Sequence, residues 1–270
     1  MPSGKQRSPM CGTIMRKLRS GNCRKGGAPM TIELQILRRE HAAQEPFLQR
    51  IPLEYEDAQM TVAAALQQIN ADPAQLDAEG KQVGTVRWSC SCMQKKCGAC
   101  AMRINGVPRL ACDTKLAEFA EKGTVLLEPL RKFPVIADLI VDRSVLMQNL
   151  LQMQIWLEAE MQADETVSDL TYDAARCLQC GCCLEVCPNF YAGGSFYGMA
   201  GMLPAARLLS ALPDVQKKTL YRSYRTHIYE GCGKSLACRK ICPAGIDMER
   251  LLVHSNAAAV WKRRFRGKKK

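Results

Sequence analysis

The chain of 270 residues has no apolar run that approaches the roughly 18 to 20 residues of a membrane-spanning helix. We therefore expect that it does not cross a membrane by itself. Residues 1–29 lack the continuous apolar segment of a secretory signal and contain no twin-arginine pair. No motif for binding RNA or DNA accompanies the net charge of +12, so we expect no nucleic-acid partner.

The positive charge is concentrated at the two ends of the chain. Residues 1–29 carry seven Lys and Arg with no acidic residue, and WKRRFRGKKK at 261–270 carries seven more, which leaves about −2 for the body. We expect a basic disordered extension over 1–29 and a solvated basic tail over 261–270. An over-extended gene start is the favoured interpretation of 1–29, because Met30 begins a strand-like segment, and an organellar presequence is the alternative. For the tail, contact with anionic lipid headgroups or a membrane-bound partner is the less favoured alternative.

Fifteen cysteines stand out in a chain whose length suits two domains. Disulfide scaffolds belong to small exported domains, whereas these cysteines are clustered at short spacings that indicate metal ligands. The first cluster is CMQKKCGAC followed by LAC, which gives C-x4-C-x2-C-x11-C with Cys92, Cys97, Cys100 and Cys112. Its opening has the spacing of plant-type ferredoxins and predicts a 2Fe-2S cluster. Zinc is the less favoured alternative, because zinc ribbons usually pair two short knuckles.

Two further clusters share one pattern. CLQCGCCLEVCP has the bacterial ferredoxin run C-x2-C-x2-C-x3-C-P, and CGKSLACRKICP repeats it with Ser235 in place of the second cysteine. In two-cluster ferredoxins the fourth cysteine of each run binds the cluster of the other run. Exchanging the fourth cysteines between the two runs predicts a 4Fe-4S cluster on Cys177, Cys180, Cys183 and Cys242. It leaves three thiolates, Cys187, Cys232 and Cys238, for a 3Fe-4S cluster. A second 4Fe-4S cluster that uses the Ser235 oxygen remains an alternative.

Four cysteines stay unassigned. Cys182 is out of register within its run and is interpreted as a small buried apolar residue, and Cys90 has a spacing that matches no known pattern. The other two, Cys11 and Cys23, lie in the basic extension.

Periodicity predicts an α+β fold in two parts. TIELQILRR, FLQRIPLEY and TVLLEPL alternate as strands, TVAAALQQINA has helical spacing, and AMRINGVPRLAC is a hairpin turning at Asn105-Gly106. These elements make a β-grasp, plant-type ferredoxin-like domain over 30–133. Helical spacing in IADLIVDRSVLMQNLLQMQIWLEAEM, LPAARLLSAL and MERLLVHSNAAAVWKR predicts an all-helical, bacterial-ferredoxin-like domain over 134–260.

With these motifs in this order, the chain resembles the iron-sulfur subunit of succinate dehydrogenase and fumarate reductase over roughly 30–260. The resemblance implies an electron relay within a quinone-linked oxidoreductase. Electrons would pass between the FAD of a partner flavoprotein and a membrane quinone through the 2Fe-2S, 4Fe-4S and 3Fe-4S clusters, with the dicarboxylate chemistry on the flavoprotein. It also implies one or more membrane anchor subunits and a location at the cytoplasmic face of the cell membrane.

Some positions depart from the family pattern. Ubiquinone-using members carry a Trp-Trp pair where this chain has Tyr191 and Ala192, and they tend to have histidine where it has Gly233. These departures favour menaquinone over ubiquinone, with Pro188 and Tyr191 as candidate quinone contacts. Lys95 stands where the family usually has glycine, which predicts a tilted first loop with its ligands retained.

Two other functions remain open. The first is the iron-sulfur subunit of a soluble thiol-linked or heterodisulfide-linked reductase, although such relatives often carry further cysteine-rich domains and none follows Cys242. The second is a zinc-stabilised interaction protein, which would be colourless where iron-sulfur clusters are brown.

Overall fold

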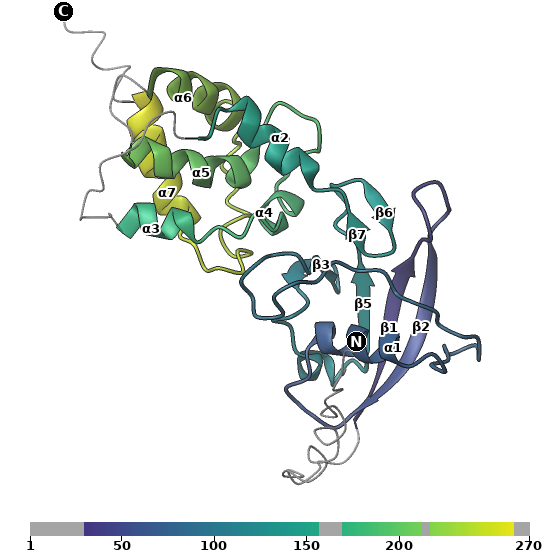
Figure 1. Ribbon diagram of the computed structural model, residues 1–270. Coiled ribbons are helices and arrows are strands. Elements are labelled where there is room, and N and C mark those ends of the chain that lie inside the picture. Colours follow the sequence, from purple (N-terminus) through teal and green to yellow (C-terminus); the bar gives the residue numbers. More distant parts are fainter. Residues whose placement is uncertain (1–29, 157–168, 212–216, 262–270) are drawn as a thin grey trace, which may run out of the picture.

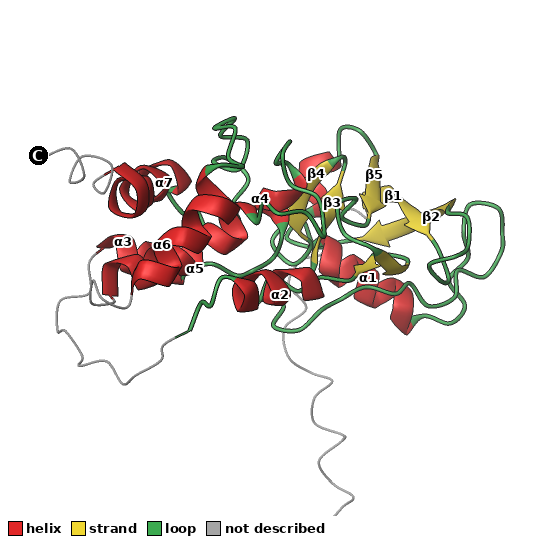
Figure 2. Cartoon of the chain, turned by 90° about the horizontal axis from the view of Figure 1, so that it is seen from above, coloured by secondary structure: helices red, strands yellow, loops and turns green. Residues whose placement is uncertain are grey.

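The computed structural model describes residues 30–156, 169–211 and 217–261, with the side chains of 210 and 211 excepted. The predicted extension over 1–29 and residues 262–270 of the tail lie outside the described residues. Two lobes follow one another along the chain, a sheet lobe and a helical lobe (Figure 1). Seen from above, the strands and the first helix gather at one end and the later helices at the other, with α4 (Cys182–Glu185) beside the hairpin of the sheet lobe (Figure 2).

A five-stranded sheet forms the first lobe, with strand order β2-β1-β5-β3-β4. Its strands are β1 (Met30–Arg38), β2 (Phe47–Tyr55), β3 (Ala101–Ile104), β4 (Val107–Leu110) and β5 (Thr124–Glu128). β1 and β5 are parallel, and the other neighbours are antiparallel. Alternate residues of β1, namely Ile32, Leu34 and Ile36, are buried, as the period of two predicts. The β-grasp prediction is confirmed.

Local signals determine the helix and the hairpin of this lobe. The helix α1 (Val62–Ala71) begins after Thr61, whose Oγ1 accepts a hydrogen bond from the Ala64 amide at 3.2 Å. Between β3 and β4, Asn105 and Gly106 both have positive φ, 47° and 79°, as a two-residue turn of this kind requires. The turn returns the chain toward the loop that precedes β3. A short 3₁₀ helix (Leu116–Phe119) then leads into β5.

The predicted helix over IADLIVDRSVLMQNLLQMQIWLEAEM is wrong in its first part. Residues 135–141 form two short paired strands, β6 (Val135–Ala137) and β7 (Ile140–Val141), before α2 (Ser144–Gln152). Asp138 turns the chain between them with φ 42°, and its buried carboxylate accepts hydrogen bonds from Arg38 Nε and the amides of Arg39 and Arg87, each at 2.9 Å. These tertiary contacts stabilise a turn where apolar spacing favoured a helix, and the end of the predicted segment lies outside the described residues.

The second lobe consists of short helices around the cysteine loops. They are α3 (Asp169–Ala175), α4, α5 (Gly198–Ala211), α6 (Lys217–Tyr224) and α7 (Met248–Asn256), with π-helical turns at Arg225–Tyr229 and Ala257–Trp261. The helix predicted over LPAARLLSAL begins earlier, at Gly198, and contains Pro204 in its interior, because Met199 and Met202 extend its buried face. Among the described residues, no helix is both long and apolar enough to span a bilayer.

Candidate metal centres

The first group of cysteines surrounds one loop of the sheet lobe. Cys92, Cys97 and Cys100 lie on the segment before β3, and the β3-β4 hairpin brings Cys112 back beside them. The Cys92 side chain interacts with that of Cys97, and the Cys100 side chain with that of Cys112. The structure therefore gathers all four cysteines predicted for the first centre.

Main-chain amides of this loop point at the sulfur atoms. The amides of Gln94 and Lys96 donate to Cys92 Sγ at 3.4 and 3.3 Å, and the Lys95 amide donates to Cys112 Sγ at 3.3 Å. The Gln94 and Lys96 amides stabilise the thiolate of Cys92 and lower its pKa to about 7. Burial has the opposite effect on Cys100, whose pKa is raised to about 12. The loop is thus built to hold negative sulfur atoms at its exposed end.

Lys95 occupies a position of this loop where the family usually has glycine. Its φ is 59°, in the left-handed region where glycine is the least strained residue. The Lys95 ammonium pairs with Asp113 Oδ2 at 2.7 Å, which ties the loop to the residue after Cys112. The amide contact to Cys112 is retained, so a side chain at this position does not open the ligand loop.

The second group lines one cavity in the helical lobe, with an empty volume of about 340 Å³. Cys177, Cys180 and Cys183 come from the first run and Cys242 from the second, which is the crossed set that the spacing predicts. The remaining wall includes Ala200, Leu203 and Met248. Burial raises the pKa of Cys177 to about 11 and also raises that of Cys183 well above the usual thiol value. A hydrogen bond from Cys182 lowers the pKa of Cys180 to about 7.

The third group lines a neighbouring cavity with an empty volume of about 400 Å³. Its wall contains Cys187, Cys232 and Cys238, together with the oxygen-bearing Ser235. Burial raises the pKa of Cys238 to about 11. Cys183 lines both this cavity and the previous one. The two cavities therefore share a wall formed by the start of α4.

Gly233 is a further wall residue of the third cavity, at the position where some family members have histidine. A Cβ atom at Gly233 would lie 2.9 Å from Nδ2 of Asn189. Asn189 in turn donates to the Gly231 carbonyl at 2.7 Å. A larger residue at position 233 would therefore have to displace the Asn189 amide from the cavity wall.

The loops of the first and second groups touch one another. A Cβ atom at Gly98, whose φ is 72°, would lie 2.8 Å from both Cys180 Cβ and the Leu178 carbonyl oxygen. Arg143, just before α2, donates from Nη1 to the carbonyls of Gly98 at 2.9 Å and Cys180 at 3.2 Å, and from Nη2 to Ala99 at 2.6 Å. One guanidinium thus holds both loops, and its positive charge lowers the pKa of Cys180.

A buried carboxylate on α4 also joins the helical lobe to the sheet lobe. Glu185, with its side chain 1% exposed, accepts from Arg103 Nη1 of β3 at 3.2 Å. The amides of Arg131 and Lys132 donate to the same carboxylate at 3.0 and 3.1 Å. Lys132 Nζ also donates to the carbonyl of Cys187. Glu185 therefore fixes the helix that lies between the second and third cysteine groups.

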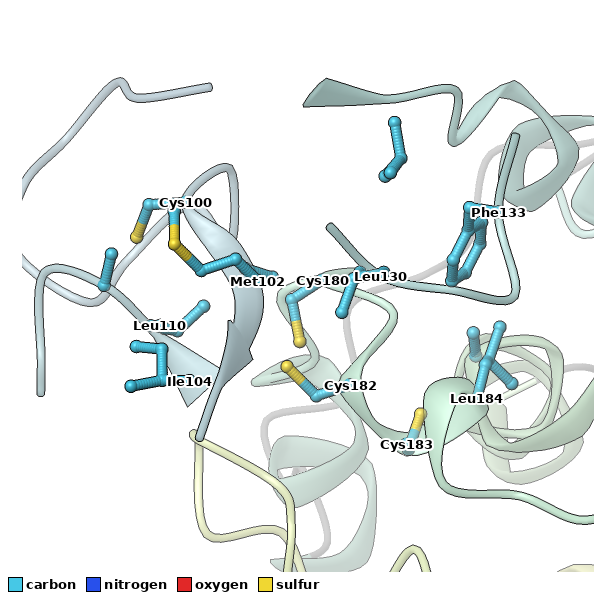
Figure 3. Packing of buried hydrophobic residues seen from close by; sticks show 14 of the residues in the cluster. Cys100, Met102, Ile104, Leu110, Leu130, Phe133, Cys180, Cys182, Cys183 and Leu184 are labelled. Atoms are coloured by element: carbon cyan, nitrogen blue, oxygen red, sulfur yellow. The ribbon is translucent and has the colours of Figure 1, made fainter. Parts of the chain in front are cut away.

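Several other predicted residues can now be placed. Pro188 is exposed beside the third group, and Tyr191 is 66% exposed, with its ring over Gly194. Cys182 is fully buried, with its sulfur facing that of Cys180 (Figure 3), and Cys90 is exposed. Cys11 and Cys23 lie outside the described residues. Arg143 and Glu185 were not predicted, because their spacing carries no signal and only the fold brings them to the cysteines.

The donor sets fit iron-sulfur clusters. Thiolates are the soft ligands that such clusters use, and amide donors to sulfur with apolar walls are the features that tune them. Within the described residues no three His, Cys, Asp or Glu side chains converge as closely as a single ion requires. A multi-iron cluster is itself several ångströms across, so its ligands stand further apart than those of one ion.

Comparison with known proteins agrees with this arrangement. Residues 33–148 match the family model of a 2Fe-2S iron-sulfur cluster binding domain, and residues 173–246 match that of a 4Fe-4S dicluster domain. The succinate dehydrogenase iron-sulfur subunit of Bacillus subtilis is 32% identical over 232 residues, which cover 81% of this chain and 88% of the relative. The chain belongs to the family of succinate dehydrogenase and fumarate reductase iron-sulfur subunits. As an iron-sulfur subunit of this kind, it is an electron-transfer component of an oxidoreductase complex.

Other members of the family extend the match. The fumarate reductase iron-sulfur subunit of Wolinella succinogenes is 28% identical over 240 residues, covering 83% of this chain and 94% of the relative. A chain of the Mycobacterium smegmatis Sdh1 complex in the apo form has the same fold, with a TM-score of 0.66 at 21% identity over 85% of this chain and 97% of that one. The 2Fe-2S and 4Fe-4S predictions are confirmed, and subunits of this family carry a 3Fe-4S cluster as well. Neither a soluble thiol-linked reductase nor a zinc-stabilised interaction protein gains support.

Proposed function

We propose that each of the three cysteine groups holds one cluster of the relay. The observation that supports this assignment is the lining of the two cavities: the first contains the crossed set of four cysteines, and the second contains Cys187, Cys232, Cys238 and Ser235, with Cys183 shared between the two. The proposed ligands are Cys92, Cys97, Cys100 and Cys112 for 2Fe-2S, Cys177, Cys180, Cys183 and Cys242 for 4Fe-4S, and Cys187, Cys232 and Cys238 for 3Fe-4S.

The arrangement of the groups supports a relay in that order. When bound, such clusters take up and release single electrons, at potentials that depend on charge, hydrogen bonds and burial. The chain's own residues supply the spacing. Gly98 allows the first loop to contact the second, Arg143 holds both, and the shared wall at Cys183 separates the second group from the third.

The two ends of the relay define the proposed partners. The first group, on an exposed loop, would face a flavoprotein that carries FAD, and the third would face a membrane anchor with its quinone. Pro188, which directly follows Cys187, and Tyr191 are both exposed and are the proposed quinone contacts, and menaquinone is favoured over ubiquinone. We place the subunit at the cytoplasmic face of the membrane, held there through its partners.

The cluster assignment can be tested on anaerobically purified protein. We expect about nine iron atoms per chain with matching acid-labile sulfide, and an EPR signal of a 3Fe-4S cluster in the oxidised state. Cys97→Ala should remove only the 2Fe-2S signal, whereas Cys238→Ala should remove the 3Fe-4S signal and leave the 2Fe-2S signal. Cys90→Ala is the matched control and should retain all three. Loss of a signal in Cys90→Ala, or its persistence in both other variants, would contradict the ligand sets.

The quinone assignment needs the assembled complex. Turnover with a naphthoquinone analogue of menaquinone should exceed turnover with a benzoquinone analogue of ubiquinone. Tyr191→Leu should raise the KM for the quinone while leaving the cluster EPR signals unchanged. An unchanged KM would remove Tyr191 from the quinone site without affecting the cluster assignment.

A further inference from the structure

A large basic cavity lies in the helical lobe, outside the three cysteine groups. Its empty space, which includes open solvent at its mouth, is about 1100 Å³, and its described lining consists of Lys218, Tyr221, Arg222, Arg225, Tyr229, Ala259 and Val260. These residues come from α6 and from the two π-helical turns, and the turn Ala257–Trp261, which continues α7, contacts both α6 and the turn Arg225–Tyr229. None of the described residues that line it is acidic. The described part of the wall therefore presents three cations and no carboxylate.

The cations of the cavity are only partly compensated. Lys218 and Arg222 are exposed, lie four residues apart on one face of α6, and form no ion pair within the described part of the chain. Like charges at this spacing repel one another on a helix. Arg225 uses Nε to bind Glu230 Oε1 at 2.9 Å, which orients the guanidinium. Its two terminal nitrogens point to no other described acceptor, so they remain available for a bidentate contact with an anion.

The backbone of the cavity wall supplies an independent observation. Arg225–Tyr229 and Ala257–Trp261 are both π-helical, and the Glu230 amide donates to the Arg225 carbonyl at 3.0 Å, five residues back. π-Helical turns are rare and are found frequently at functional sites. Trp261 Nε1 lies 3.4 Å from the Tyr229 hydroxyl and joins the two turns. Both unusual turns of the described chain thus line this one cavity.

The chemistry of the lining indicates the occupant. Lys218, Arg222 and Arg225 suit a phosphate group, while Ala259, Val260 and the two tyrosine rings offer an apolar wall. A free phosphate would leave this wall unused, whereas a phospholipid headgroup has a phosphodiester next to an apolar glycerol ester. Aromatic rings with a polar tip are also typical of membrane interfaces.

We infer that this cavity binds the headgroup of an anionic phospholipid and holds the helical lobe against the membrane surface. Lys234, which lines the third cavity, lies over the Tyr229 ring at 6.0 Å from its centroid, so the basic cavity adjoins the third cysteine group. The inference rests on the proposed function in one respect, since that group is where electrons would leave for a membrane quinone. A headgroup bound here would place this exit at the bilayer.

Vesicle flotation of the full chain with its clusters tests the inference. We compare phosphatidylcholine vesicles with and without phosphatidylglycerol, using Lys218→Gln combined with Arg222→Gln. Each basic residue near an anionic surface contributes about five-fold to the affinity, so the double variant should bind phosphatidylglycerol vesicles about 25-fold more weakly. The control, Arg50→Gln combined with Lys122→Gln, removes the same charge from exposed positions of the sheet lobe and should stay close to wild type.

A second variant distinguishes binding of a headgroup inside the cavity from general electrostatic attraction between the basic residues and the vesicle surface. Val260→Trp fills the cavity and leaves every charge in place, so it should also weaken binding to phosphatidylglycerol vesicles. Equal binding by the cavity and control variants, or no effect of Val260→Trp, would overturn the inference. So would full competition by inorganic phosphate at matched concentration, which would indicate a free-phosphate site. Normal vesicle binding with lost assembly onto the membrane anchor would instead identify a protein occupant.

The EPR spectra of the clusters are recorded on the same samples. Failure of the relay therefore appears as missing cluster signals, and failure of the lipid site appears only in the flotation assay. Unchanged spectra in each variant also show that the helical lobe has folded around its centres.

Discussion

Arg143 Nη1 donates a hydrogen bond to the main-chain carbonyl of Cys180 at 3.2 Å, from a position outside both cysteine runs. The same guanidinium holds the Gly98 and Ala99 carbonyls of the first loop. Two cysteine loops that we assign to different centres thus depend on one side chain outside both cysteine runs. The contact has consequences for stability and for redox potential, and these can be separated by substitution.

Arg143→Gln should lower both the free energy of unfolding and the midpoint potential of the 4Fe-4S cluster. Loss of the charge-assisted hydrogen bonds should reduce the free energy of unfolding by about 2 kcal/mol. Loss of the positive charge near Cys180 should lower the midpoint potential of the 4Fe-4S cluster, because the reduced form carries more negative charge. Arg143→Lys is the matched control, since it keeps the charge and loses the fork of donors. Urea unfolding and an EPR-monitored redox titration measure the two effects, and equal potentials in the Gln and Lys variants would contradict the electrostatic role.

Gly98→Ala tests the close approach of the two loops. The added Cβ would meet Cys180 Cβ and the Leu178 carbonyl oxygen at 2.8 Å, and the residue would also have to keep φ at 72°. We expect a loss of about 3 kcal/mol in the free energy of unfolding and incomplete loading of both centres. Gly106→Ala shares the positive φ, 79°, but its nearest neighbour is at 3.7 Å, so it should cost only about 1 kcal/mol. Similar losses in the two variants would show that the loops do not constrain one another.

Ser235→Cys should convert the third centre to a 4Fe-4S cluster. Ser235 lines the cavity beside Cys187, Cys232 and Cys238, so a thiolate there would complete a set of four. The oxidised 3Fe-4S EPR signal should disappear, and a new signal should appear on reduction. Ser235→Ala should keep the 3Fe-4S signal, because it removes an oxygen that we do not assign as a ligand. A Ser235→Cys spectrum identical to wild type would place residue 235 outside the ligand geometry.

Cluster loading should depend on pH in a defined direction. Burial raises the pKa of Cys100 to about 12 and those of Cys177 and Cys238 to about 11, so these thiols carry protons in the free protein at neutral pH. Ligation requires thiolates, so loading releases these protons and becomes more favourable as the pH rises. An indicator dye in weak buffer measures the release directly. Loading with no proton release would contradict the protonated resting state.

The same shifts affect the stability of the protein before its clusters are inserted. The ordinary thiol pKa is 9.0, so the unfolded chain ionises before the folded one. Between about pH 9 and pH 11 the folded state holds more protons than the unfolded state, and the free energy of unfolding must fall with rising pH. Chemical denaturation across this range measures the fall. A flat profile would show that the folded thiols are better hydrated than the structure indicates.

The part of the fold that sequence could predict rests on local rules. Asn105-Gly106 requires a particular turn, strand alternation gives the buried face of β1, and cysteine spacing gives the candidate ligand sets. Each of these signals is contained within a few residues. The two ferredoxin-like parts and their order followed from them.

The parts of the fold and of the candidate site that sequence did not predict depend on contacts between segments that are distant in the chain. Residues 135–141 have helical apolar spacing, yet the carboxylate of Asp138 finds Arg38 and two amides that only the folded sheet supplies. Arg143 and Glu185 occupy positions with no distinctive pattern, and their partners lie far away in the sequence. Sequence therefore predicted the cysteine groups that the fold gathers and missed the side chains that hold their loops in place.

The wall at Cys183 makes the two helical-lobe centres mutually dependent. Each cavity takes residues from both the 177–187 run and the 232–242 run, with α5 and α6 in the span between them. A cluster bound in either cavity would act as a cross-link between segments remote in sequence, and would restrict the unfolded chain as a covalent bridge does. Maturation of the lobe should accordingly be all-or-none, with half-loaded intermediates short-lived and prone to degradation.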